Sequence, residues 1–244
     1  MKKLRRITEA EVIAEFLQGE FFHSEYDADR ERFAEIVSHP NLTNEAENAL
    51  RQALLFRRRD TMWWELPEDR QWWEIEFESQ DIEKVSVFPR AHWRDIARGN
   101  FKATYVATQV RRLLEQKDPS PFARKMQAIC SNLGSDDRKD MIVFLGLDEH
   151  NRVTLLEGNH RFIASLVAGN GLTLKGQRMV AVFSPDMEQC CWYKTNFKTL
   201  FRCLKNRIKH KWDRDTDVSS LLQKAARTPT VSAPAENALP VKTK

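Results

Sequence analysis

The stretch 152–168 constrains the fold of this chain more than any other, because it joins a strand to a helix through a single glycine. Residues 153–156 are mostly apolar and predict a short strand, and residues 162–167 repeat apolar side chains at helical spacing. Gly158 allows a sharp turn between them, which leaves the first peptide N–H groups of the helix pointing outwards. The junction is typical of a domain in which helices pack on a sheet.

The turn itself reads Glu157-Gly158-Asn159-His160-Arg161. A helix N-terminus has a partial positive charge and free donors, and His160 and Arg161 add cationic or hydrogen-bonding side chains beside it. A phosphate group is the ligand that this arrangement favours. The alternative is an ordinary strand-to-helix turn whose charged side chains are solvated.

The composition of the 244 residues, 41% hydrophobic and 30% charged, predicts a soluble globular chain. No apolar run approaches the length of about 18 residues that a membrane span needs, and the basic start of the chain lacks the apolar segment of a secretory signal. The cysteines show no zinc-type spacing, so we expect reduced thiols and a cytoplasmic location. The net charge of +4 does not by itself indicate a nucleic-acid binder.

Residues 1–78 are expected to form a helical region. A capping box at Thr8–Glu11 begins the first helix, and further helices are predicted over 27–37 and 44–58. The region ends in two tryptophan pairs, which either pack it onto the next domain or offer a stacking platform for a base; they are Trp63, Trp64, Trp72 and Trp73. Acidic residues around these pairs would repel a polyanion, so packing is favoured.

Residues 79–185 combine short apolar strands with helices, and we expect the chain to belong to the α+β class. The elements predicted here are strands over 82–88, 141–145, 152–156 and 179–183, and helices over 91–97, 105–115 and 121–133. The run at 141–145 is apolar throughout, which indicates a strand that is buried on both faces.

The part 186–227 is predicted to contain a basic amphipathic helix, and the tail 228–244 is predicted to be disordered. The helix should occupy 192–212. The basic residues of 194–214, together with the cluster Arg57–Arg59, favour contact with nucleic acid as one interpretation. The other interpretation is a surface helix that docks onto the body through its aromatic face.

The order of elements over residues 80–184, with the glycine turn before a helix that contains Ala164 and Ala168, resembles the ParB/sulfiredoxin-like superfamily. The resemblance implies a small mixed β-sheet of ParB/sulfiredoxin type and a nucleotide-binding core over 79–185. Sulfiredoxins carry Gly-Cys-His-Arg where this chain has Gly158-Asn159-His160-Arg161. Asparagine offers no thiolate at the position of their catalytic cysteine, so sulfinic acid reduction by that route is not expected.

The ParB-like serine kinases carry an Asp-Gly-His-Thr-Arg-type motif, and the turn of this chain looks like a variant with Glu157 at the acidic position. The resemblance implies that Glu157 is catalytic, binds Mg²⁺ or orients a hydroxyl group. The expected cofactor is a nucleotide, ATP, ADP or CTP, with Mg²⁺. Its phosphates would be held by Gly158, Asn159, His160 and Arg161, and by Arg90 at the end of the first predicted strand.

Three functions follow from this resemblance and from the residues. The first is a phosphotransferase, a kinase that acts on a small hydroxyl-bearing molecule. The second is a ParB-like regulator in which a nucleotide gates contact with nucleic acid or with a protein. The third is an interaction protein without catalytic activity, whose tryptophan pairs and helical region are partner surfaces.

Overall fold

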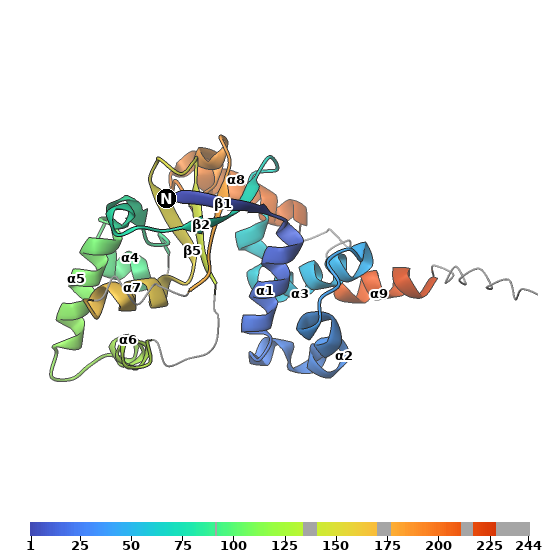
Figure 1. Cartoon of the computed structure of the whole chain (residues 1–244), viewed down its shortest axis with the longest axis horizontal. Coiled ribbons are helices and arrows are strands. Elements are labelled where there is room, and N and C mark those ends of the chain that lie inside the picture. The colour runs from blue at the N-terminus through green and yellow to red at the C-terminus, as the bar shows by residue number, and fades with distance from the viewer. Residues whose placement is uncertain (91, 134–140, 170–176, 211–216, 228–244) are drawn as a thin grey trace, which may run out of the picture.

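A six-stranded mixed sheet forms the centre of the molecule (Figure 1). The computed structural model describes residues 1–90, 92–133, 141–169, 177–210 and 217–227. The strands lie in the order β1-β2-β6-β4-β5-β3. Their bounds are β1 Lys2–Ile7, β2 Gln71–Glu76, β3 Val85–Ser86, β4 Ile142–Gly146, β5 Val153–Glu157 and β6 Met179–Phe183. Strands β4 and β6 are parallel, as are β3 and β5, and the other neighbours are antiparallel.

Helices cover both faces of the sheet, as Figure 1 shows. One face carries α1 Glu9–Glu20, α2 Asp27–Ser38, α3 Glu45–Trp63 and α9 Val218–Arg227. The other carries α4 His92–Ala97, α5 Ala103–Leu114, α6 Pro121–Ser131 and α7 Asn159–Val167. Short 3-10 turns lie at Ser24–Tyr26, Ser79–Lys84 and Met187–Gln189, and α8 spans Phe197–His210. Among the described residues, none of the helices combines the length and the apolar character required to cross a membrane.

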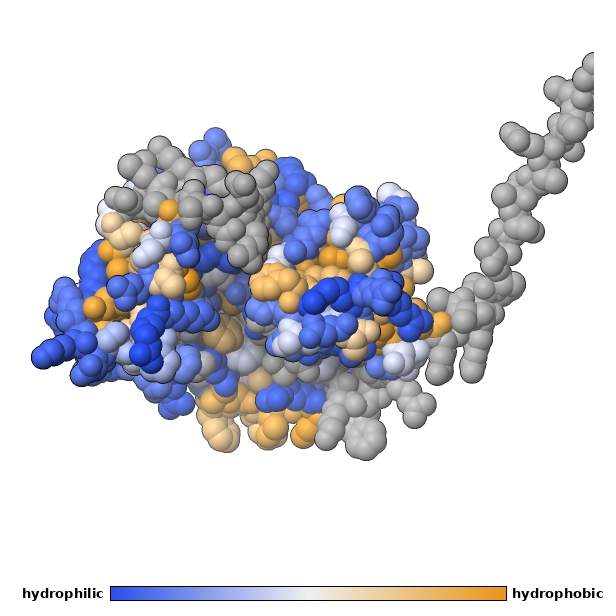
Figure 2. All heavy atoms as spheres, turned by 90° about the horizontal axis from the view of Figure 1, so that it is seen from below, coloured by the Kyte–Doolittle hydropathy of each residue, from blue (hydrophilic) through white to orange (hydrophobic). Residues whose placement is uncertain are grey.

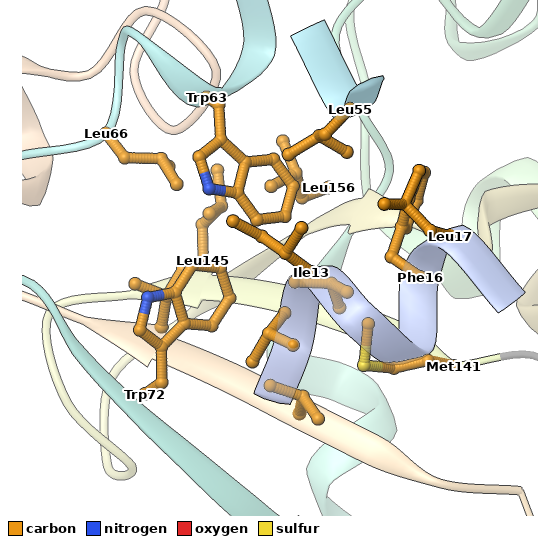
Figure 3. Close-up of a cluster of buried hydrophobic side chains, with 14 of the residues drawn as sticks. Ile13, Phe16, Leu17, Leu55, Trp63, Leu66, Trp72, Met141, Leu145 and Leu156 are labelled. Carbon is orange, nitrogen blue, oxygen red and sulfur yellow. The ribbon is translucent and has the colours of Figure 1, made fainter. Parts of the chain in front are cut away.

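The central strands are apolar throughout because each of them contributes to two cores. Val143 and Leu145 of β4 enter the core beneath α1, whereas Ile142 and Phe144 enter the core beneath α7. Successive side chains of a strand point to opposite faces, so a strand covered on both sides needs hydrophobic residues at every position. Figure 3 shows the first of these cores, in which α1 packs its apolar face against the sheet.

The tryptophans at the end of α3 and in β2 pack against each other. The rings of Trp63 and Trp72 are stacked, with centroids 5.4 Å apart, and each residue is only 3% exposed (Figure 3). The indole N–H of Trp63 also donates to Oε1 of Glu9 at 2.7 Å. The packing interpretation is therefore confirmed for this pair, and the stacking platform is wrong for these two rings because no base can reach their faces.

The expected α+β class, with a mixed sheet and flanking helices, is confirmed at this level. The region 1–78 is mainly helical but also contributes β1 and β2, and β2 pairs with β6. The sheet therefore crosses the boundary expected at 78/79. Of the strand expected over 82–88, only Val85–Ser86 pairs with a neighbour, because a 3-10 turn occupies the residues before it. The tail 228–244 lies outside the described residues.

Helix α8 docks onto the body by a different face from the expected one. Thr199 and Cys203, four residues apart, are buried. The large hydrophobic residues of the helix are instead exposed; they are Phe197, Leu200, Phe201, Leu204 and Ile208. Docking through the aromatic face is therefore wrong.

Candidate functional site

The turn between β5 and α7 requires glycine on two grounds. Gly158 has a φ of 82°, in the left-handed region, and is the N-cap of α7. A Cβ atom at this position would lie 2.9 Å from Cγ1 of Ile142. The peptide N–H of Gly158 donates to Oε1 of Glu157 at 3.0 Å, so the acidic side chain folds over the start of the turn.

Asn159 joins the turn to the segment that follows β3. Its buried side chain accepts a hydrogen bond from the peptide N–H of Phe88 at 2.9 Å and donates to the carbonyl oxygen of Leu156 at 3.4 Å. The structure therefore joins Phe88 to the turn. The amide of Asn159 is engaged by the backbone, so its primary task is to hold these two segments together.

Arg90 lies beside an aromatic residue that the sequence places far away. Its guanidinium carbon is 4.6 Å from the ring centroid of Trp192, which in turn packs on Phe88 at 4.9 Å. Its Nε and Nη2 atoms are shielded from solvent and find no acceptor among the described residues. Arg90 is thus held by stacking on an aromatic face, with hydrogen-bonding capacity left over.

His160 points towards α4 and α6. Its ring centroid lies 5.0 Å from that of Trp93 and 6.0 Å from that of Phe122. Burial, with a further contribution from Lys125, lowers the pKa of His160 to about 4. The imidazole is therefore neutral at pH 7. It supplies no positive charge, and its ring faces α4 and α6 and not the cleft that Arg161 lines.

Arg161 lines a narrow cleft between α1 and the β5–α7 turn. Its Nη2 lies 3.5 Å from the carbonyl oxygen of Met141. The residues that line the cleft are Glu15, Phe16, Gly19, Glu20, Met141, Glu157 and Arg161. Figure 2 views the molecule from below, where a hollow separates the two groups of helices. The cleft encloses only about 10 Å³, on the order of one water molecule.

Arg59 is the main site residue that the sequence did not single out. Its Nη2 lies 3.1 Å from Oε2 of Glu157 and 3.6 Å from Oε2 of Glu20, and its guanidinium carbon is 5.8 Å from the ring centroid of Phe16. The backbone of Arg59 departs from helical geometry at a kink in α3. The only signal in the sequence was the basic cluster Arg57–Arg59, and it carried no information about Glu157.

The charges around the cleft nearly balance. Glu15, Glu20 and Glu157 line it, and Arg161 and Arg59 oppose them. Arg178 adds a third cation next to Glu15, and burial raises the pKa of that carboxyl group. These carboxylates would repel a bare polyphosphate. A cation bound between the carboxylates and the phosphate would neutralise the negative charge of both.

The arrangement has the donors for a phosphate group, but a phosphate needs more room than the cleft encloses in this conformation. Arg161, Arg59 and the first turn of α7 provide donors, and Glu157 provides carboxylate oxygen for a hard cation. A nucleotide needs far more room than the cleft encloses, so α1 would have to move away from the turn. Comparison with models of known protein families, with curated proteins and with solved structures found no match for this chain.

Proposed function

We propose that this chain is a ParB-like protein that binds the phosphates of a nucleotide at the turn 157–161 and transfers a phosphoryl group to a small hydroxyl-bearing molecule. The observation that carries the proposal is the meeting of Glu157, Arg161 and Arg59 at the N-terminus of α7. Phosphoryl transfer depends chiefly on positioning and on neutralising charge, and these groups supply both.

The side chains have separate roles in this proposal. Arg161 and Arg59 bind phosphate oxygens, and the peptide N–H groups of the first turn of α7 add donors. Glu157 is the catalytic residue, which holds the cation or orients the hydroxyl group of the substrate. His160 packs on Trp93 and Phe122, on another side of α7 from the cleft, and there holds the start of the helix in place. Gly158 and Asn159 shape the turn, whereas Arg90 stacks on Trp192 and is not among the residues that line the cleft.

Mg²⁺ fits the donor set in a limited way. Magnesium is commonly held by one or two carboxylates, with water and substrate phosphates completing its coordination. Glu157 is the carboxylate next to the phosphate donors. When bound, the ion would neutralise charge that develops on the transferred group.

A second candidate function is the nucleotide-gated regulator, and the closed state of the cleft favours it. Arg59 ties α3 to Glu157, and α1 forms the opposite wall of the cleft. A nucleotide that enters must therefore displace the N-terminal helices, which would couple its binding to a distant surface. A protein or a nucleic acid at 194–214 is the partner that the sequence predicts.

Nucleotide binding is tested by isothermal titration of ATP, ADP and CTP in the presence of Mg²⁺. The wild-type chain is expected to bind one of them. Arg161→Ala should weaken binding by about tenfold or more, because a charge-assisted hydrogen bond is lost. Arg112→Ala, on the exposed side of α5, is the matched control and should bind like the wild type. Absence of binding to the wild type, or equal binding by Arg161→Ala, contradicts the proposal.

A transfer assay separates the two candidate functions. Labelled γ-phosphate should appear on free serine or on another small alcohol with the wild-type chain but not with Glu157→Gln. If the wild type binds the nucleotide without any transfer, the regulator is favoured. A gel shift would then identify nucleic acid as the partner. The shift should weaken with added salt and respond to the nucleotide, and it should be lost in the Lys205→Glu and Lys209→Glu variants.

A further inference from the structure

Three potential metal ligands meet on the side of the sheet where α8 docks. Among the described residues, Glu65, Cys191 and Cys203 form the one group of three such side chains whose ligand atoms all lie within 4.8 Å of one another. All three residues are buried. Glu65 lies between α3 and β2, Cys191 lies just after the 3-10 turn Met187–Gln189, and Cys203 lies on α8. The spacing of the cysteines along the sequence did not indicate that Cys191 and Cys203 lie close together.

We propose that Glu65, Cys191 and Cys203 form a binding site for a thiophilic divalent cation, with zinc as the expected ion. Two sulfur atoms and one carboxylate suit zinc and exclude magnesium and calcium, which select oxygen ligands. Bonds of about 2.0–2.3 Å in a tetrahedral site place the ligand atoms about 3.3–3.8 Å apart. The side chains therefore need to close by at most about 1–1.5 Å, and water or the second carboxylate oxygen supplies the fourth ligand.

The surroundings of the two cysteines hold their side chains in place. The hydroxyl group of Thr195 donates to the carbonyl oxygen of Cys191 at 2.9 Å, and the turn 190–194 is closed by backbone hydrogen bonds. Burial raises the pKa of both the Cys191 and the Cys203 thiols, so both carry their protons while no metal is bound. Binding releases their protons to solvent, and the dication balances the charge of the two thiolates.

The site has a structural role, because it links three segments that are distant in sequence. Thr199 and Cys203 are the buried residues of α8 among those described, so the helix has a small contact with the body. A bound cation joins this helix, through Glu65, to the segment between α3 and β2. Metal should therefore raise the thermal stability of the chain, and a chelator should lower it. This inference does not depend on the proposed phosphate site.

The test uses the full chain, purified under reducing conditions and titrated with Co²⁺ as a spectroscopic substitute for Zn²⁺. An equimolar amount of cobalt should bind and give a sulfur-to-cobalt charge-transfer band, which Cys191→Ser and Cys203→Ser should abolish. Glu65→Gln should weaken cobalt binding by about tenfold or more. Cys130→Ser, on α6, is the matched control and should retain the band.

A wild-type chain without the charge-transfer band overturns the proposal, as does a band that survives Cys191→Ser. If the serine variants fail to fold, thiol alkylation of the wild type decides the question. Zn²⁺ should protect Cys191 and Cys203 from alkylation in mass spectra and leave Cys130 reactive. Equal labelling of Cys191 and Cys203 with and without Zn²⁺ contradicts a site at these residues.

A second, independent observation concerns the exposed face of α8. Phe197 is 87% exposed and Phe201 is 63% exposed, and Leu200, Leu204 and Ile208 continue the same stripe at helical spacing. Figure 2 shows hydrophobic side chains that protrude at its lower edge, on the side of the molecule where α8 lies. A contiguous apolar patch of this kind on a monomer marks an interaction site.

The charge of α8 identifies the kind of surface that the stripe fits. The helix contains no acidic residue, and its basic residues are Lys198, Arg202, Lys205, Arg207 and Lys209. A second copy of the chain would bring like charges together, and nucleic acid offers no apolar layer for five hydrophobic side chains. We infer that α8 lies in the interface of an anionic lipid membrane, with its stripe among the acyl chains and its basic residues at the headgroups.

Vesicle co-sedimentation tests this inference. The wild-type chain should pellet with vesicles of phosphatidylglycerol and phosphatidylcholine but not with phosphatidylcholine alone. Phe201→Ser combined with Leu204→Ser should lower the partition coefficient by about tenfold or more. Phe22→Ser is the matched control, because Phe22 is 54% exposed on another part of the surface. No binding to anionic vesicles overturns the inference, and so does self-association of the wild type that the double variant abolishes.

Discussion

Each residue of the β5–α7 turn has its own physical reason for being there. Gly158 provides a backbone conformation that other residues rarely adopt, and Asn159 satisfies the backbone of the segment after β3. His160 is half-buried between aromatic rings and neutral at pH 7, whereas Arg161 lines the cleft beside Glu157. Consecutive residues on a helix point about 100° apart, which sends His160 and Arg161 to different sides.

Gly158→Ala should destabilise the chain by about 2–4 kcal/mol, through backbone strain and the close approach of the new Cβ to Ile142. Gly99 also has a positive φ, but a Cβ atom there meets nothing within 4 Å. Gly99→Ala should therefore cost only the strain, about 1–2 kcal/mol. Urea denaturation of both variants measures the difference. An equal loss in the two would mean that Ile142 moves aside freely.

His160 should make stability depend on pH above the range in which carboxylates titrate. Its pKa in the folded chain is about 4, below the ordinary value of 6.5, so the unfolded chain binds the proton more tightly. The contribution of neutral His160 to the free energy of unfolding is fully present above about pH 6.5. It is lost as the pH drops towards 4, which lowers stability by up to about 3 kcal/mol. His160→Gln should flatten this dependence between about pH 7 and pH 5. Free energies of unfolding at several pH values test this, and an unchanged slope in the variant contradicts it.

The sequence was sufficient to locate the turn but not to assign all of its contacts. The need for glycine at 158 and the approach of Phe88 could both be predicted from the pattern and the resemblance. The pairing of Arg59 with Glu157 could not, because 98 residues separate them along the chain and no local pattern connects them. The direction of His160 depends on rings supplied by α4 and α6, which a local pattern does not place.

At the scale of elements, helices with a clear apolar period were predicted well. The capping box at Thr8–Glu11 is present, with hydrogen bonds in both directions, and α2, α5, α6 and α7 lie close to their predicted ranges. Strand β1 was missed because it is a short edge strand rich in lysine and arginine, without the alternation that marks a half-buried strand. Strand β2 was missed because its tryptophans were interpreted as a packing patch rather than as part of a ladder.

The stacked tryptophans should account for much of the attachment of α3 to the sheet. Trp63→Leu removes the stacking on Trp72 and the hydrogen bond to Glu9, so it should cost about 3 kcal/mol or more. Trp64 is adjacent in sequence but half-buried, and Trp64→Leu should cost clearly less. Thermal and urea unfolding of the two variants give the comparison. Equal losses would show that the stack contributes little beyond its buried area.

At the scale of the whole molecule, the cleft lies at the end of β5, between α1 of one group of helices and the start of α7 of the other. Helix α1 packs its apolar face on the sheet and offers Glu15 and Glu20 to the cleft, while α7 begins on the other side of it. The Arg59 pairs, the ion pair of Arg178 with Glu15 and the packing around Met141 help to close this gap. Opening the cleft therefore requires breaking the ion pairs of Arg59 and of Arg178, which join the N-terminal helices to the sheet.

In the proposed function, Glu157 repels a bare phosphate and binds the cation that accompanies a nucleotide. Titration of ADP into the wild type and into Glu157→Gln, with and without Mg²⁺, tests it most directly. Without Mg²⁺, the variant should bind ADP about tenfold more tightly, because it no longer repels the phosphates and releases Arg59 to them. With Mg²⁺, the variant should bind about tenfold more weakly, because a metal ligand is lost. A change in the same direction under both conditions, or no change in either, would contradict the account.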